Sequence, residues 1–181
     1  MAKKIGAIVS LIIIGIVIFA AIVMANIDVK YNVECVKPDK IWVQTPNDQH
    51  FATDEQKNKI VDFINNASKH NALVALFDGE LGKKAELVSS KATLANPKNF
   101  YVRYFYNTEQ DLMVDGAEYK DADGNTVTFK ELIFTVVDAK GEIEVRAYVL
   151  TSNDENNQYS YYYNFEADFE KLFNYLTEEF A

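Results

Sequence analysis

The chain is poor in the residues that most often carry catalysis or bind metals. It contains one cysteine, Cys35, and two histidines, His50 and His70, which lie far apart in the sequence. A single cysteine excludes an internal disulfide, and a zinc site usually needs several histidine or cysteine ligands. The sequence has no G-x-S-x-G elbow, no phosphate-binding loop and no dinucleotide-binding glycine pattern. We therefore predict no metal, no cofactor and no enzymatic activity.

Positive charge is also scarce. The 18 lysines and arginines face 27 aspartates and glutamates, which gives a net charge of −9, and the only arginines are Arg103 and Arg146. An acidic domain repels phosphate backbones, so nucleic acid is not expected as a partner. The preference for lysine over arginine, with abundant Asn, Ile, Tyr and Phe, is typical of an AT-rich coding sequence and favours a bacterial source.

One long apolar run lies near the N-terminus, where residues 5–25 contain no charge. As a helix this run extends roughly 31 Å, which matches the hydrocarbon core of a bilayer. The apolar core of a cleaved signal peptide is shorter, typically about 7–15 residues. An uncleaved signal anchor is therefore the preferred prediction, and cleavage after Ala25 is the alternative. Lys3 and Lys4 favour a cytoplasmic N-terminus.

These observations predict a single-pass protein of the cell membrane. Residues 1–4 are expected to form a cytoplasmic tail, residues 5–25 a transmembrane helix, and residues 26–181 one extracytoplasmic domain. A chain of this length after the anchor is long enough to bury a core of its own.

Beyond the anchor, alternation of apolar and polar residues predicts a series of strands. They are expected at 27–35, 41–43, 71–77, 100–106, 113–120, 127–137, 143–150 and 159–165. Cys35 falls on the apolar side of the first strand and is expected to be buried.

Two D-A-x-G sequences, at 121–124 and 138–141, predict tight turns between strands. The first also suggests a calcium loop. Its glycine, however, stands at the fourth position, and a leucine occupies the twelfth, where an EF-hand needs a glutamate. A hairpin turn is therefore preferred.

Two amphipathic helices are expected to pack on the strands. Thr53 and Gln56 form a capping box ahead of apolar residues at helical spacing, which predicts a helix over 54–69. An apolar stripe from Phe165 to Phe180 predicts a C-terminal helix that needs a partner surface. The fold class is therefore α+β, with an antiparallel β-meander packed by an N-terminal-side helix and a C-terminal amphipathic helix. This layout resembles small cystatin-like or NTF2-like extracytoplasmic modules at the level of architecture only.

Alternation also assigns side chains to the two faces of the sheet. The less apolar faces of three predicted strands carry both arginines and several tyrosines. If these faces align, they form a patch of Tyr101, Arg103, Arg146, Tyr148 and Tyr162. Tyrosine and arginine are enriched at interaction hot spots, so these five are the predicted partner-binding residues. The alternative interpretation is ordinary cross-strand pairing on a solvated sheet.

The most aromatic stretch, YSYYYNF at 159–165, divides by the same rule. Tyr159, Tyr161 and Tyr163 share a face with Phe165, at the start of the C-terminal apolar stripe, and are expected in the core. Tyr162 alone points to the other face.

The predicted function is a membrane-anchored extracytoplasmic binding or structural module, part of a cell-envelope assembly or an adaptor. Its expected partner is a protein or a second copy of the chain. Replacing Arg103 and Arg146 with alanine is expected to weaken partner capture with little change in stability. Two alternatives are kept. A carboxylate-dependent hydrolase requires a deep pocket where acidic residues converge, and a small-ligand sensor requires an empty cavity between sheet and helix.

Overall fold

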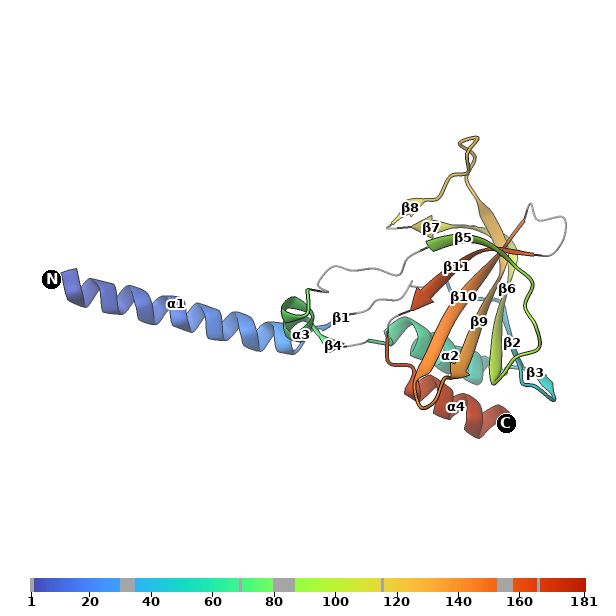
Figure 1. Cartoon of the computed structure of the whole chain (residues 1–181), viewed down its shortest axis with the longest axis horizontal. Helices are drawn as coiled ribbons and strands as arrows, with labels where there is room; N and C mark the ends of the chain where they lie inside the picture. The colour runs from blue at the N-terminus through green and yellow to red at the C-terminus, as the bar shows by residue number, and fades with distance from the viewer. Residues whose placement is uncertain are drawn as a thin grey trace.

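The sheet of the domain is built from strands far apart in the sequence, as the computed structural model in Figure 1 shows. The structure describes residues 2–29, 35–68, 70–79, 87–114, 116–152, 158–165 and 167–181. Within these residues, seven strands form one antiparallel sheet in the order β3-β2-β6-β9-β10-β11-β5. They are β2 (Lys40–Gln44), β3 (Gln49–Phe51), β5 (Leu87–Ala92), β6 (Phe100–Asp111), β9 (Thr128–Asp138), β10 (Ile143–Thr151) and β11 (Tyr159–Phe165).

Helices α2 (Asp54–Asn66) and α4 (Glu170–Phe180) lie side by side on one face of this sheet (Figure 1). We call this the inner face. The buried side chains of α2 are Ile60 and Ile64, and those of α4 include Leu172 and Leu176. All four belong to the same core cluster as the inner-face residues of the strands. The α+β class with two packing helices is therefore confirmed.

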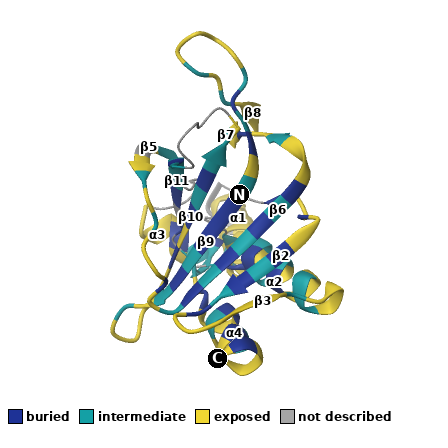
Figure 2. Cartoon of the chain, turned by 90° about the vertical axis from the view of Figure 1, so that its right-hand side faces the viewer, coloured by how far each residue is buried: buried dark blue, intermediate teal, exposed yellow. Residues whose placement is uncertain are grey.

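Aromatic rings link the centre of the sheet to α4. Tyr104 on β6 contacts Phe134 on β9 with ring centroids 4.8 Å apart, and Phe134 stacks on Phe165 of β11 at 5.9 Å. Phe165 in turn meets Phe169, just before α4, edge-on at 6.0 Å. Such pairs add about 0.5–1.5 kcal/mol each beyond their burial. Buried residues alternate with partly exposed ones along β6 and β10, as period two requires (Figure 2).

The capping box that predicted α2 is present. The Gln56 amide donates to Thr53 Oγ1 at 3.3 Å, and the Thr53 amide donates to Gln56 Oε1 at 2.9 Å. Cys35 is buried, as expected, at the border of the core. The strands predicted at 127–137, 143–150 and 159–165 are also found, with bounds that differ by at most one residue.

The region predicted as a strand at 113–120 is instead a small hairpin. Strand β7 (Met113–Val114) pairs antiparallel with β8 (Ala117–Glu118), and residue 115 lies outside the described residues. Gly116 takes φ 79° between the two strands. Glycine reaches this left-handed region at no steric cost, so the chain reverses there rather than continuing.

The segment that follows the N-terminal apolar run differs most from the prediction. Helix α1 (Ala2–Ala25) is followed by β1 (Asp28–Val29), which pairs with β4 (His70–Asn71). Residues 30–34 of the predicted first strand lie outside the described residues. The predicted strand at 71–77 is wrong, because Ala72–Phe77 forms a helix, α3. The Val74 amide donates to the Asn71 side chain at 3.1 Å, and this N-cap starts the helix.

Candidate functional site

The face opposite α2 and α4, which we call the outer face, carries a continuous row of paired residues. Cross-strand register joins one residue from each of the seven strands, and we call this set the central row. In spatial order it consists of Phe51, Trp42, Arg103, Ile133, Tyr148, Tyr162 and Val88. Directly opposed side chains on one face of a sheet lie about 4.5–5.5 Å apart at Cβ, so each member contacts its neighbours.

All five predicted binding residues lie on the outer face. Arg103, Tyr148 and Tyr162 belong to the central row. Tyr101 and Arg146 occupy the next row, since each of them pairs with Thr135 of β9. The structure therefore brings the five residues together on the side that α2 and α4 leave uncovered.

Arg103 is the most constrained member of the row. Its Nε donates to Glu131 Oε1 at 3.0 Å, and its Nη2 lies 2.8 Å from the same oxygen. Nη2 also donates to the Tyr159 hydroxyl at 3.1 Å, and that hydroxyl donates to Glu131 Oε1 at 2.7 Å. The three side chains thus form a closed, largely buried network, with 26% of the Arg103 side chain and 14% of the Glu131 side chain exposed.

Burial and partners act in opposite directions on the pKa values of this network. Burial lowers the pKa of Arg103, but the hydrogen bonds and charges of Tyr159 and Glu131 together raise it above its usual value. Burial is the main cause that raises the pKa of Tyr159 to about 12. Arg103 is therefore a fixed cation and Tyr159 a neutral donor at physiological pH.

Near one end of the row, the Arg103 guanidinium lies over the Trp42 ring, which contacts two further rings. Its Cζ lies 5.6 Å from the centroid of the Trp42 ring, within the range of a cation–π contact. Trp42 stacks on Phe51 at 5.6 Å and meets Phe105 at 6.3 Å. Phe51 is 66% exposed. This end of the row therefore presents an apolar ring to solvent.

Sequence reasoning missed Trp42 and Phe51 as site residues. Trp42 stands between the buried Ile41 and Val43, so alternation alone could have placed it on the outer face. Phe51 could not be found this way. Its place in the row depends on the pairing of β3 with β2, which short strands do not specify.

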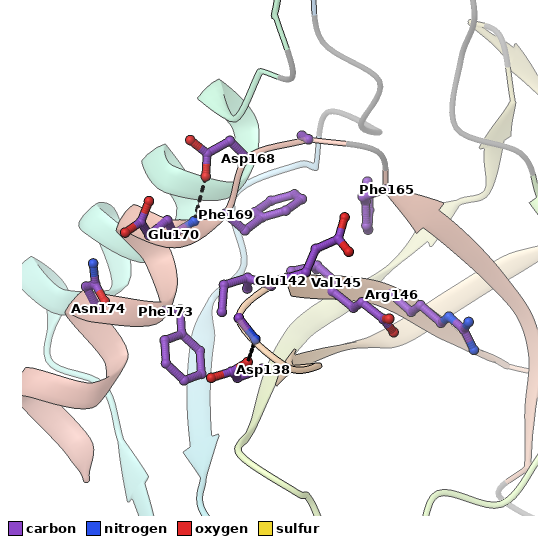
Figure 3. Close-up of a pocket in the computed structure, with 14 residues that line it drawn as sticks. Asp138, Glu142, Val145, Arg146, Phe165, Asp168, Phe169, Glu170, Phe173 and Asn174 are labelled. Carbon is purple, nitrogen blue, oxygen red and sulfur yellow. Dashed lines mark hydrogen bonds between the residues drawn. The ribbon is translucent and has the colours of Figure 1, made fainter.

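Toward the other end of the row, the exposed Arg146 lies over the Tyr162 ring, which contacts Tyr148. Arg146 Cζ lies 5.9 Å from the Tyr162 ring centroid, and the rings of Tyr148 and Tyr162 are 5.6 Å apart. The Arg146 side chain points away from α4 (Figure 3). Tyr101, in the same row as Arg146, donates its hydroxyl to the Ala95 carbonyl at 2.6 Å. Burial, followed by the nearby Tyr148, raises the pKa of Tyr101.

The assignment of Tyr159 to the core beneath the helices is wrong. Tyr163 and Phe165 are in the inner core and Tyr161 packs against it, as expected, but Tyr159 contacts Arg103 and Glu131 on the outer face. The pairing of β11 with β5 shifts register between Tyr159 and Tyr161. Regular pairing of β11 with β10 covers only residues 161–165, so Tyr159 lies beyond it, where the alternation of those residues no longer fixes the face of a side chain.

A second feature is a hollow of about 890 Å³ at the start of α4, between that helix and β10. Figure 3 shows Phe169 reaching from the α4 side toward Phe165. Five exposed carboxylates surround it, from Asp138, Glu142, Glu144, Asp168 and Glu170.

Two of these carboxylates serve the local fold. Asp138 Oδ1 accepts from the Gly141 amide at 2.6 Å in the turn between β9 and β10, and Asp168 Oδ1 accepts from the Glu170 amide at 2.9 Å at the start of α4. Among the described residues, no group of three or more His, Cys, Asp or Glu side chains is arranged to hold a metal ion.

Comparison with known proteins gives no significant match to a protein-family model, to a curated sequence or to a solved structure. The resemblance to cystatin-like and NTF2-like modules therefore carries no argument about function, and the proposal below depends on the site alone.

Proposed function

We propose that the chain is a single-pass, membrane-anchored module whose extracytoplasmic domain binds a protein partner through the central row. The observation that carries this proposal is the row itself, with Trp42, Arg103 and Tyr162 in register and Phe51 largely exposed. Trp, Tyr and Arg dominate binding energy at protein interfaces, and a fixed guanidinium among rings loses little entropy on binding. The partner is a component of a cell-envelope assembly or a second copy of the chain.

The proposed anchor is α1. Residues Ile8–Ala25 form an apolar helix of 18 residues, none of them buried against the domain. At about 1.5 Å per residue this span is about 27 Å long, which fits a bilayer core of about 30 Å. A signal sequence begins with a similar helix, so retention of α1 and a cytoplasmic N-terminus are part of the proposal.

Site-specific photocrosslinking in native membranes tests the proposal. A benzophenone amino acid is placed at Phe51, at one end of the row, and, separately, at Tyr162, next to the other end. The matched control is Val36, which is 62% exposed against 66% for Phe51 and stands outside the row. We expect one discrete adduct from both row positions, none from Val36, and loss of the adduct when Arg146→Glu is added. The same adduct from Val36, or no adduct from the row, contradicts the proposal.

A small-ligand sensor is the second candidate, because the hollow between β10 and α4 is the feature that such a protein requires. The test is a thermal-shift screen of the full chain against small cationic molecules, which five surrounding carboxylates favour. A sensor predicts a stabilising ligand whose effect is lost in Glu170→Lys and kept in Tyr162→Ala. A carboxylate-dependent hydrolase has less support, since the acids around the hollow are exposed and two of them hold backbone amides.

A further inference from the structure

Helix α3 has an apolar surface that no part of the protein's core explains. All six of its residues, ALVALF, are apolar, and only Ala72 and Ala75 are buried. Val74 and Leu76 are 41% and 49% exposed, and Phe77 is 82% exposed. We call Val74, Leu76 and Phe77 the apolar tip. A helix without a polar face is normally surrounded by protein or lipid, but among the described residues the apolar tip remains exposed.

The position of α3 is fixed relative to the end of α1. The Ala72 amide donates to the carbonyl of Ile27 at 2.7 Å, two residues beyond the last residue of α1. Strand β4 leads directly into α3 and pairs with β1, which follows α1. Helix α3 also packs against α1 itself, beside its C-terminal end (Figure 1).

This attachment determines the depth of the apolar tip if α1 spans a bilayer. The last turn of α1 then lies at the boundary of the hydrocarbon core, and the headgroup layer beyond it is about 5–8 Å thick. Six helical residues are about 9 Å long, so every residue of α3 stays within or next to that layer. The tip is therefore held where apolar side chains can enter the lipid.

We propose that α3 is an interfacial helix, whose apolar tip inserts into the outer boundary of the lipid bilayer and holds the domain at the membrane surface. This inference depends on the proposed anchoring by α1. Lipid is the chosen occupant because the tip continues the apolar surface of α1, whose own side chains face outward. Asp28 and Asp78, both exposed, flank the tip, so insertion is shallow and needs no anionic lipid.

The test uses the full chain in phosphatidylcholine vesicles at high dilution, with single cysteines labelled by an NBD fluorophore. The labelled positions are Phe77→Cys in the tip, Ile18→Cys in α1 and Phe51→Cys on β3, at the end of the sheet farthest from α1 (Figure 1). Phe51 is a matched control because it is another highly exposed phenylalanine. The parent chain, whose Cys35 is buried, controls for background labelling.

We expect blue-shifted emission at position 77 and loss of most of its intensity when the lipid carries brominated acyl chains, with position 51 unaffected. Quenching at position 18 without quenching at 77 overturns the interfacial helix and leaves the anchor standing. Absence of quenching at both positions overturns the anchor and the inference together. Blue-shifted emission at 77 that brominated lipid does not quench means that protein, such as a second copy, covers the tip, and this also overturns the inference.

Discussion

Arg103 and Arg146 lie on the same face, but the structure predicts different consequences when each is removed. Arg103→Ala deletes both contacts that Arg103 makes to Glu131 and the one it makes to Tyr159. It leaves Glu131, whose side chain is 14% exposed, with only the Tyr159 hydroxyl as a donor within the network. Arg146 is exposed and lies over the Tyr162 ring. The sequence alone treats the two arginines as equivalent.

The expected cost of Arg103→Ala lies between two reference cases. An exposed ion pair contributes about 0–1 kcal/mol, whereas breaking a fully buried pair costs about 3–5 kcal/mol because one charge stays buried and uncompensated. With about a quarter of the Arg103 side chain exposed, an intermediate loss of about 2–3 kcal/mol is expected. Arg146→Ala should change the free energy of unfolding by less than about 0.5 kcal/mol, as surface substitutions usually do.

Trp42 provides the assay for this comparison. It is the only tryptophan of the chain, and its ring lies 5.6 Å from Arg103 Cζ. Urea unfolding of the full chain in detergent micelles, followed by Trp42 emission, gives the free energy of unfolding of each variant. The emission of folded Arg103→Ala should also differ from the parent, whereas that of folded Arg146→Ala should not.

A double-mutant cycle separates the network from a general packing defect. In Arg103→Ala combined with Glu131→Gln the buried charge is gone, so the combined loss should be smaller than the sum of the single losses by about 1–2 kcal/mol. Strictly additive losses, or equal small losses for Arg103→Ala and Arg146→Ala, would refute the description of Arg103 as a buried, structural arginine. In that case Arg146→Ala would be no more specific a test of partner binding than Arg103→Ala.

Three further predictions concern single residues. The Tyr104 hydroxyl is buried without a hydrogen-bond partner among the described residues, so Tyr104→Phe should keep or raise the free energy of unfolding measured in urea. As a control, Tyr106→Phe loses the 2.9 Å hydrogen bond that the Tyr106 hydroxyl donates to the Val36 carbonyl, and it should lower that free energy by about 1 kcal/mol. The Tyr159 hydroxyl keeps its proton in the folded state up to about pH 12 but loses it near pH 10 in the unfolded state. The free energy of unfolding should therefore fall as pH rises between these two values, and it should fall less steeply in Tyr159→Phe. Lys140 has φ 64°, so Lys140→Gly should raise the melting temperature, and Gly141→Ala, at φ 91°, should lower it.

The parts of the fold that follow from local periodicity could be predicted from the sequence. Strict alternation along β6 and β10 placed Arg103 and Arg146 on the same, outer face. The apolar stripe of α4 predicted that this helix packs against one face of the sheet, which is the inner face. The capping box placed the start of α2 at the correct residue. In each case the signal lies within one element, and long regular elements repeat it several times.

The parts that could not be predicted depend on partners distant in the sequence or on local irregularity. Tyr159 lies on the face opposite to the predicted one, at a position beyond the regular β10–β11 pairing, which ends at Tyr161. The apolar residues 72–77 include no polar residue to reveal a period, so strand and helix fit them equally, and the Asn71 cap selects the helix. The neighbours of Arg103 in the central row come from β2 and β9, and only the strand order identifies them.

The dimensions of the central row bear on the choice between a protein partner and a small molecule. Seven neighbouring strands about 4.8 Å apart span about 29 Å. A standard protein interface covers about 800 Å² on each partner, which corresponds to a patch about 28 Å across. Small ligands are instead enclosed by concave pockets, whereas the row has a buried middle residue, Ile133, and ends at Phe51, which is 66% exposed. The row therefore matches a macromolecular surface in extent, while the hollow beside α4 has the volume of a small-ligand site. Variants at Phe51 and at Glu170 consequently test the two functions independently.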